Sequence, residues 1–258
     1  MPFSRDRPQV GVFGRLPGPG SGKSRLAIDV GPDRARALAE AFLGDVLARA
    51  DAVAPERTWW WIAPDEGPRA GPGGAATIEA AAGSGIVPAR VRLEVQRGDH
   101  LGARMEHALA TMLTEGPALL VGADAPDAPL AAVIHAFAWL GDDADRGGRP
   151  RLVFGPAEDG GFWLVGADTP LDGLLAARTA WGTGDVLART LADAAAAGRR
   201  WDVHLLDPWS DVDTGRDLEA LAARLAAARA RGEAARPGWP GRTAALVLGN
   251  SSSSCGSR

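Results

Sequence analysis

The sequence contains a single cysteine, no tyrosine and no long hydrophobic run. Cys255 is the one cysteine among 258 residues. Because one thiol forms neither an internal disulfide nor a cysteine-based metal site, the composition excludes both and is typical of a reducing compartment, which predicts a cytoplasmic protein. No apolar run is long enough to span a bilayer, and no hydrophobic segment precedes the first predicted strand. We therefore expect neither a membrane partner nor a signal peptide.

Positive charge is not in excess either. The chain carries 28 Lys and Arg residues against 32 Asp and Glu, a net charge of -4. This balance excludes a global basic field that would recruit nucleic acid, although local basic residues can still meet phosphate groups. The four histidines show no zinc-ligand spacing, and the chain has no Gly-x-Ser-x-Gly elbow. The sequence thus supports neither a zinc site nor a serine hydrolase triad.

Short apolar strands alternate with amphipathic helices along most of the chain. This order predicts an α/β fold, a single three-layer α/β/α domain with a mostly parallel sheet. The turn at 158–161 predicts a hairpin-like excursion before the last helices. We expect strands at 9–13, 58–63, 91–96, 118–121, 151–156, 162–167 and 204–206, and helices at 23–28, 32–50, 75–83, 101–113, 130–140, 185–197 and 215–231.

The composition changes after residue 231. Residues 232–258 are rich in Gly, Pro and Arg and then in Ser. Low-complexity segments of this kind seldom bury enough apolar surface to fold, so we predict a single domain at 1–231 followed by a disordered tail at 232–258. The short apolar run 244–248 is the one part of the tail suited to docking on the domain.

Two acids follow the apolar run 118–121. The run predicts a buried strand, and it ends in Gly122-Ala123-Asp124-Ala125-Pro126-Asp127. Open α/β sheets bind ligands at the carboxyl ends of their strands, which is where Asp124 and Asp127 are expected. Hard cations such as Mg²⁺ prefer oxygen ligands of this kind. The alternative is a helix start with either acid as N-cap and Pro129 in the first turn, and one acid can serve each purpose.

The loop after the first strand imitates a phosphate-binding P-loop. The Walker pattern requires a glycine at position 17, where this chain has Pro17, and Gly18 leaves the loop one residue short. The prolines also remove backbone donors, so we disfavour a P-loop NTPase. Phosphate binding is still favoured by the cations around the start of the following helix and by glycines that allow close backbone approach. The residues are Arg15, Gly20, Lys23 and Arg25; the alternative is a solvated surface turn.

Acids and glycines also follow the later strands. Glu158 and Asp159 precede Gly160 and Gly161, which suit either close approach of a ligand or an ordinary hairpin turn. The acids of this turn are candidate ligands for a sugar hydroxyl or a metal.

Two further acids precede the helix at 215–231. Asp211 and Asp213 lie on the same side of an extended segment, so they are candidates to face the sheet edge that carries Asp124. The alternative is that Asp213 or Thr214 caps the helix. Upstream, Asp99 is a predicted N-cap and Arg104 is either a phosphate ligand or a solvated side chain.

Six segments in the same order resemble one family. They are 13–27, 96–105, 122–127, 155–162, 181–183 and 209–214, which include Gly-Ala-Asp-Ala-Pro-Asp, Glu-Asp-Gly-Gly-Phe and Trp-Ser-Asp-Val-Asp-Thr. Together they are similar to the radical-SAM/selenodomain-associated transferase 1 family, also labelled arsenosugar-biosynthesis-type glycosyltransferases, in the GT-A superfamily of nucleotide-diphospho-sugar transferases. The resemblance covers about residues 9–225. Gly14, Gly182 and the pair Gly215-Arg216 depart from the residues usual in that family.

This resemblance implies a GT-A fold and a metal-dependent transferase with a nucleotide-activated donor. It favours sugar transfer from a nucleotide sugar to a small-molecule acceptor. Related superfamily members are nucleotidyltransferases for 2-phospholactate, the molybdenum cofactor and 3-deoxy-manno-octulosonate, so transfer from an NTP is the alternative. A catalytically inactive nucleotide-binding protein is the third. The oligomeric state is not readable from the sequence.

The resemblance, with the residue patterns above, also assigns roles. Mg²⁺ or Mn²⁺ would be held by Asp124 and Asp213. The catalytic set is Asp124, Asp159 and Asp211, the last two as candidate general bases. The nucleotide and phosphate ligands would be Arg15, Gly20, Lys23, Arg25, Asp99 and Arg104, and the substrate pocket would comprise Glu158, Gly160, Gly161 and Trp181.

Overall fold

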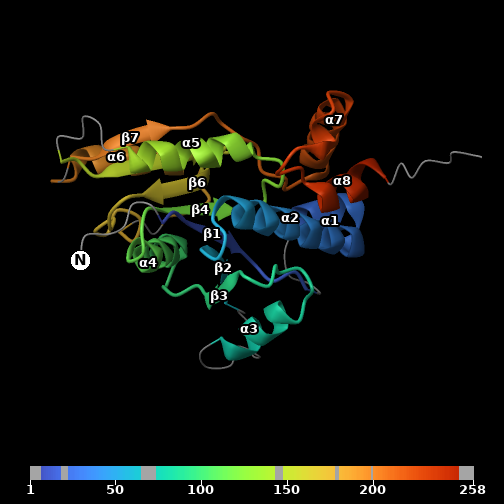
Figure 1. Cartoon of the computed structure of the whole chain (residues 1–258), viewed down its shortest axis with the longest axis horizontal. Coiled ribbons are helices and arrows are strands. Elements are labelled where there is room, and N and C mark those ends of the chain that lie inside the picture. The colour runs from blue at the N-terminus through green and yellow to red at the C-terminus, as the bar shows by residue number, and fades with distance from the viewer. Residues whose placement is uncertain are drawn as a thin grey trace, which may run out of the picture.

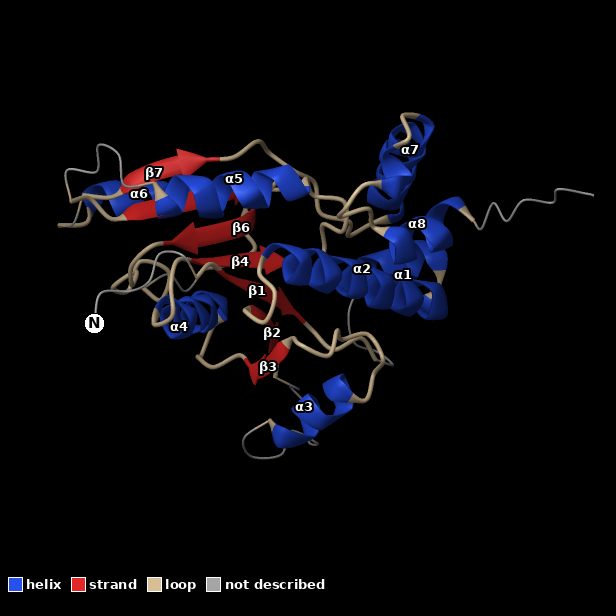
Figure 2. Cartoon of the chain, in the orientation of Figure 1, coloured by secondary structure: helices blue, strands red, loops and turns tan. Residues whose placement is uncertain are grey.

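A seven-stranded sheet with helices on both faces forms the centre of the computed structural model (Figure 1, Figure 2). The structure describes residues 7–18, 23–64, 74–142, 148–177, 180–198 and 200–249. The strands are β1 (Gln9–Gly14), β2 (Thr58–Ile62), β3 (Arg92–Val95), β4 (Ala118–Gly122), β5 (Arg151–Pro156), β6 (Phe162–Ala167) and β7 (Asp202–Leu205). The helices are α1 (Ser24–Val30), α2 (Pro32–Val53), α3 (Ala75–Ala82), α4 (Leu101–Leu113), α5 (Leu130–Gly141), α6 (Val186–Ala196), α7 (Gly215–Ala230) and α8 (Gly241–Leu248), with a 3₁₀ turn at Glu233–Ala235.

The strand order is β3-β2-β1-β4-β6-β5-β7. Every neighbouring pair is parallel except the two pairs that involve β6, which runs antiparallel to both β4 and β5. The predicted α/β class and the mostly parallel sheet are therefore confirmed, as is the hairpin-like excursion between β5 and β6. Because β1 and β4 are adjacent and parallel, their carboxyl ends lie at the same edge of the sheet.

Two hydrophobic layers cover the sheet. One contains residues of α2 and α5 packed on Val12, Trp60 and Val121. The other contains residues of α4 and α6 packed on Trp61 and Phe154. Alternate residues of β2 thus enter opposite layers, as the period of a strand requires, and all five residues of β2 are buried. A sheet covered on both faces explains the nearly continuous apolar runs of its strands.

The expectation of a disordered tail from residue 232 is wrong for residues 232–249. Helix α8 packs against α2 and α7, and Ala244 is buried in a third apolar cluster with Leu38 and Phe42. The Asp45 carboxylate on α2 accepts hydrogen bonds from the backbone N–H groups of Arg242 at 3.1 Å and Thr243 at 2.7 Å. An acid from another helix thus satisfies the first turn of α8, which a reading of composition does not reveal. Residues 250–258 lie outside the described residues.

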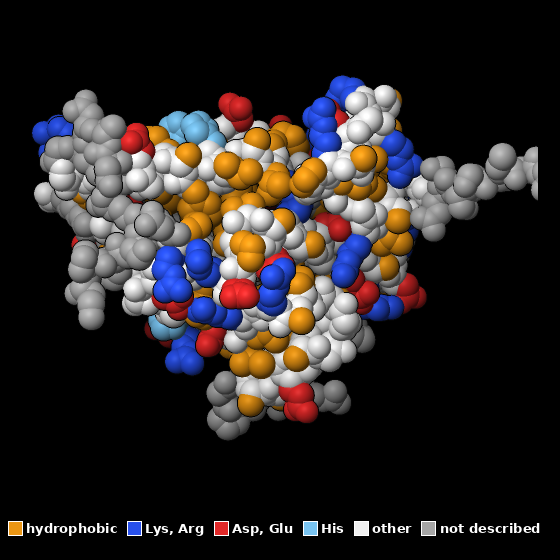
Figure 3. All heavy atoms as spheres, in the orientation of Figure 1, with side chains coloured by type: hydrophobic (Ala, Val, Ile, Leu, Met, Phe, Trp, Pro, Cys, Tyr) orange, Lys and Arg blue, Asp and Glu red, His pale blue; other side chains and the backbone are white. Residues whose placement is uncertain are grey.

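The surface carries charges of both signs. On the face shown in Figure 3, Lys and Arg side chains are interspersed with Asp and Glu side chains, and apolar side chains gather over α5. Among the helices that the structure describes, none combines the length and the apolar character needed to cross a membrane.

Candidate functional site

A cavity of about 500 Å³ opens where β1 and β4 end. Its wall is formed by the segment after β1, the start of α1, the adjoining side of α2 and the segments that follow β3 and β4. Six of the residues singled out in the sequence line this one cavity, although they come from five separate segments of the chain. They are Arg15, Lys23, Arg25, Arg104, Asp124 and Asp213.

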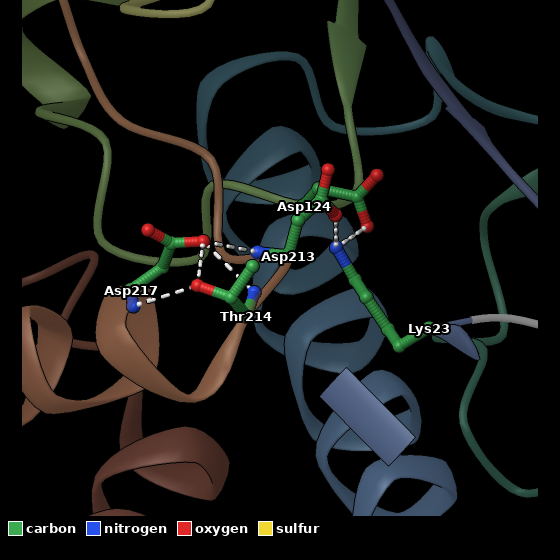
Figure 4. A network of polar contacts seen from close by, with 5 residues as sticks. All are labelled: Lys23, Asp124, Asp213, Thr214 and Asp217. Atoms are coloured by element: carbon green, nitrogen blue, oxygen red, sulfur yellow. Dashed lines mark hydrogen bonds and ion pairs between the residues drawn. The ribbon is translucent and has the colours of Figure 1, made fainter. Parts of the chain in front are cut away.

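Lys23 lies between the two acids of this cavity. Its Nζ is 2.6 Å from Asp124 Oδ1 and 2.9 Å from Asp213 Oδ1 (Figure 4). The lysine side chain is only 6% exposed, whereas the carboxylates of Asp124 and Asp213 are 53% and 49% exposed. The two acids therefore converge on one cation and keep about half of their surface open. Lys23 was expected to face phosphate, and its contact with both acids was not anticipated.

Electrostatics in this cluster perturb two ionisable groups. Burial by itself would lower the pKa of Lys23, but the Asp124 and Asp213 carboxylates outweigh it, so its pKa is raised above 10.5 and the ammonium is charged. Burial raises the pKa of Asp211 to about 7, with a further contribution from the negative charge of Asp124. Asp159 also raises the pKa of Asp211, so the turn after β5 lies within electrostatic reach of this cluster.

The segment that carries Asp213 is held by the start of α7. The hydroxyl of Thr214, the N-cap, accepts from the backbone N–H of Asp217, and one oxygen of the Asp217 carboxylate accepts in return from the backbone N–H groups of Asp213 and Thr214 (Figure 4). This capping box satisfies the exposed donors of the first turn. Of the two candidate caps, the structure has Thr214 at the N-cap, and the Asp213 side chain faces the cavity.

The segment that carries Asp124 is hydrogen-bonded to the segment that carries Asp213. The backbone N–H of Val212 donates to the Asp124 carbonyl at 3.0 Å. Three residues on, the Asp127 carboxylate is only 7% exposed and accepts from Arg224 Nε at 2.7 Å and from Trp209 Nε1 at 3.1 Å. Backbone and side-chain contacts thus hold the two acid-bearing segments together.

Asp127 is neither a helix cap nor a residue of the cavity. Helix α5 begins at Leu130 with Pro129 at the N-cap, and no side chain caps it. The alternative, in which Asp124 or Asp127 caps this helix, is therefore wrong. Asp127 instead meets Arg224, a partner 97 residues away that its own neighbourhood in the sequence does not indicate.

Asp99 does not occupy its predicted positions. The N-cap of α4 is His100, whose Nδ1 accepts from the backbone N–H of Ala103, and Asp99 is exposed and does not line the cavity. Arg104, one turn into α4, does line it, and its Nε donates to the Gly98 carbonyl at 3.0 Å. Gly20 lies outside the described residues.

The residues expected to form the substrate pocket do not line this cavity. They are Glu158, Gly160, Gly161 and Trp181, and the candidate bases Asp159 and Asp211 are also not among the lining residues. Gly160 has φ of +86°, and a Cβ atom there would collide with the Gly184 carbonyl. Trp181 packs on Gly102 of α4 and meets the Phe162 ring edge-on at 6.2 Å. Both residues have clear structural roles in the turn and in its packing.

The sequence patterns did not indicate Glu106, which anchors the segment before Trp181. Its carboxylate accepts from the backbone N–H of Gly173, from Leu175 at 3.0 Å and from Ala176 at 2.8 Å. Gln96 was also not singled out as a ligand, although it lines the cavity and its Nε2 donates to the Trp61 carbonyl at 2.9 Å. Its place at the end of a strand, within a segment that resembles the family, was the available signal.

The cavity suits a divalent cation only in part. The Lys23 ammonium marks one cation position shared by two carboxylates, and carboxylate oxygens are the ligands that Mg²⁺ and Mn²⁺ prefer. Within the described ranges, however, no group of three or more His, Cys, Asp or Glu residues is placed to hold a metal. The residues therefore fit an ion held by two carboxylates, with its other ligands supplied by phosphate and water.

Known proteins share this architecture. Residues 70–183 match a family described as "Uncharacterized protein conserved in bacteria (DUF2064)". A search of curated proteins gave no match. The chain is similar to the crystal structure of a candidate nucleotide-diphospho-sugar transferase from Desulfovibrio desulfuricans, with 24% identity and a TM-score of 0.72 over 94% of this chain and 97% of that chain. The fold is that of the nucleotide-diphospho-sugar transferases.

Two further solved structures are more distant. A cytidylyltransferase from Leptospira borgpetersenii has 14% identity and a TM-score of 0.48 over 83% of this chain and 84% of its own. A 4-diphosphocytidyl-2C-methyl-D-erythritol synthase from Anaerococcus prevotii has 10% identity and a TM-score of 0.49 over 86% of this chain and 98% of its own. Likenesses of this size carry no conclusion about the present chain.

Proposed function

We propose that this chain is a metal-dependent transferase that uses a nucleotide-activated donor, with a nucleotide sugar favoured as that donor. The observation that carries this proposal is the single cavity at the carboxyl edge of β1 and β4. Four cations and two acids from distant segments line it, namely Arg15, Lys23, Arg25, Arg104, Asp124 and Asp213. Such an edge is where open α/β sheets bind their ligands.

The cations are suited to a diphosphate. Arginine guanidinium groups bind phosphate oxygens through two parallel hydrogen bonds, and Arg15, Arg25 and Arg104 present three such groups to the cavity. Arg25 lies in the first turn of α1, where backbone N–H groups also favour an anion. We therefore place the donor phosphates against the start of α1, with Arg104 on the opposite side.

The acids are suited to the metal that such donors bring. Asp124 and Asp213 would hold Mg²⁺ or Mn²⁺, since their carboxylates already converge on one cation. A divalent ion bound there would neutralise the charge that develops on the leaving phosphate group. The buried pair of Asp127 and Arg224 and the capping box at Thr214 keep the two acids at this spacing.

The acceptor would lie towards the turn after β5. The backbone N–H of Trp209 donates to the Pro156 carbonyl at 3.0 Å, so the segment that leads to Asp211 and Asp213 passes beside this turn. This contact supports a position for the acceptor between the turn and the cavity. Glu158, Gly160, Gly161 and Trp181 belong to this second region. Asp159 and Asp211 are our candidates for the general base, and the choice between them rests on mutagenesis.

Sugar transfer and nucleotidyl transfer need the same phosphate and metal ligands. They differ in whether the acceptor attacks the anomeric carbon of the sugar or the α-phosphorus of an NTP. The motifs that resemble the arsenosugar-biosynthesis-type glycosyltransferases support the first, as does the similar fold of the candidate nucleotide-diphospho-sugar transferase from Desulfovibrio desulfuricans.

A thermal-shift panel tests the proposal. UDP-, GDP-, ADP- and CDP-sugars and the four NTPs would each be added with and without Mn²⁺, because a ligand that binds only the folded state raises the melting temperature. We expect a metal-dependent shift with one nucleotide sugar, lost in Asp124→Asn and kept in the matched variant Glu219→Gln on the exposed face of α7.

Three other results would change the assignment. A shift with one NTP and with no nucleotide sugar would identify a nucleotidyltransferase. A shift that survives both metal removal and Asp124→Asn would identify a nucleotide-binding protein without the metal chemistry. The absence of a shift with any member of the panel would contradict the proposed function as a whole.

A further inference from the structure

The lysine that joins the two acids is unique in this chain. Lys23 is the only lysine in the sequence, and every other cationic side chain apart from histidine is an arginine. An ammonium is a compact point charge on a flexible stem, whereas a guanidinium is a broad planar fork. Of these two groups, the ammonium is closer in size and shape to a metal ion held between two carboxylates.

The geometry makes Lys23 a competitor of the metal. Its Nζ lies 2.6 Å from Asp124 and 2.9 Å from Asp213, so a divalent ion cannot enter between these oxygens while the ammonium remains. The side chain is 6% exposed and has exchanged its hydration for the two carboxylates. Removing it from this position without a new anionic partner would leave a desolvated charge unpaired.

Donor phosphates would provide that new partner. Arg15, Arg25 and Arg104 line the same cavity. Phosphate bound to them would lie close enough for the Lys23 ammonium to contact it. Phosphate would also complete the coordination of the metal, because the described residues place no third His, Cys, Asp or Glu beside the two carboxylates to hold a metal. The donor phosphates thus supply both the new anionic partner for Lys23 and the missing ligands of the metal.

We infer that Lys23 closes the metal position in the nucleotide-free protein, and that metal binds there only with donor phosphates that draw the ammonium away. This inference rests on the proposed function and adds a binding order to it. The order has a chemical use, since a site closed by its own lysine does not hold a bare metal ion that would bind other anions.

Mn²⁺ binding, measured by the loss of the free-ion electron paramagnetic resonance signal, tests the inference without any assay of activity. We expect Lys23→Met to bind Mn²⁺ alone about tenfold more tightly than the natural protein or better, because a positive charge in direct contact with both ligands is gone. Asp124→Asn in the Lys23→Met background should abolish the gain. Inorganic phosphate should raise the Mn²⁺ affinity more in the natural protein than in Lys23→Met.

Arg25→Met is the matched control. It removes a cation that lines the same cavity but that contacts neither acid among the described residues. If the Mn²⁺ affinity rose no more in Lys23→Met than in Arg25→Met, only the overall electrostatic potential of the cavity would have changed. That result would overturn the inference.

A second measurement needs no variant, so a folding defect in Lys23→Met cannot obscure the result. Protein labelled with ¹⁵N-lysine should give one side-chain ammonium signal in the NMR spectrum. The two ion pairs should slow the exchange of the ammonium protons with water enough for this signal to be observed. We expect this signal to shift on addition of inorganic phosphate with Mg²⁺, and not with Mg²⁺ alone. A signal displaced by Mg²⁺ alone would overturn the inference. The proposed function fails separately, if no nucleotide in the thermal-shift panel binds.

Discussion

The loops that follow β4 and β5 each carry two acids, but the side chains of these acids have different kinds of partner in the two loops. After β4, Asp124 meets Lys23 in the cavity, and Asp127 is buried against Arg224 and Trp209. After β5, Asp159 accepts from the backbone N–H of Gly161 in its own turn at 2.8 Å, and Glu158 is exposed.

The difference lies in the range of the contacts. Acids of the β4 loop meet cations from distant segments of the chain, whereas Asp159 meets only its own turn among the described contacts of its side chain. A carboxylate that faces a partly dry cavity can hold a cation, while one that stabilises a turn mainly sets the path of the backbone. We therefore expect metal binding at the β4 loop, and we expect the β5 loop to shape what lies beside it.

The largest expected effect contrasts Asp124 with Asp159. Asp124→Asn removes half of the negative charge that holds the cation, so transferase activity should fall about 100-fold to 1000-fold. Asp159→Asn keeps the shape of its turn and should lower activity by less than about tenfold, and a larger loss would identify Asp159 rather than Asp211 as the general base. Steady-state kinetics with the donor found in the thermal-shift panel would measure both. Equal losses would erase the distinction between the two loops.

The buried acid of the β4 loop should matter for stability. Arg224→Ala leaves the Asp127 carboxylate, 7% exposed, without its charged partner. We expect a loss of about 2–3 kcal/mol in the free energy of unfolding, below the full cost of breaking a buried pair because Arg224 is itself 31% exposed. Chemical denaturation would measure it.

Arg189→Ala is the control for that variant. Arg189 pairs with Asp185 on the surface, where the two side chains are 57% and 43% exposed, so its loss should lower the stability much less than Arg224→Ala does. If the two variants were equally stable, the Asp127 pair would not hold the acid-bearing segments together.

A smaller effect tests the backbone of the β5 loop. Gly160→Ala forces a side chain into a left-handed conformation and against the Gly184 carbonyl, and should cost about 1–3 kcal/mol. Gly182 has a similar φ of +77°, but nothing lies within 4 Å of an added Cβ. Gly182→Ala should therefore cost about 1 kcal/mol from the conformation alone. Thermal unfolding of the two variants would separate the cost of the collision with Gly184 from the cost of the left-handed conformation. A Gly160→Ala variant as stable as Gly182→Ala would show that the turn can shift to make room for the added methyl group.

The smallest effect concerns Asp45, an acid buried without an ion pair among the described contacts. Burial raises the pKa of Asp45 above 3.8, although the backbone N–H of Thr243 opposes this shift. The folded state thus keeps its proton to higher pH than the unfolded chain does. The stability that this group contributes is fully present below pH 3.8 and is lost as the pH rises through the raised pKa.

Urea denaturation at a series of pH values would detect this loss. The natural protein should lose stability relative to Asp45→Asn as the pH rises from about 3 to about 7. Glu219→Gln, which alters an exposed acid on α7, should track the natural protein. Parallel profiles for Asp45→Asn and the natural protein would mean that α8 does not depend on the ionisation of Asp45.

Much of the fold was predictable because its signals are local. The apolar runs located every strand to within about two residues, and the helices alternating with them required a mostly parallel sheet. The α/β class then placed the strand ends at one edge, which brought Asp124 into the same cavity as Arg15 and Lys23. Helix α8 escaped prediction because its first turn is satisfied by Asp45, nearly 200 residues earlier.

The sequence by itself determined the fold class and the residues that are candidates to bind phosphate and metal. These features are readable because strand period, glycine placement and acid spacing are patterns of a few neighbouring residues. Tertiary structure alone decided which acid meets which cation. Asp124 and Asp127 are three residues apart, yet one faces the cavity with Lys23 and the other is buried against Arg224. An ion pair joins segments 97 or 190 residues apart only after the sheet has set their positions, so no local pattern encodes it.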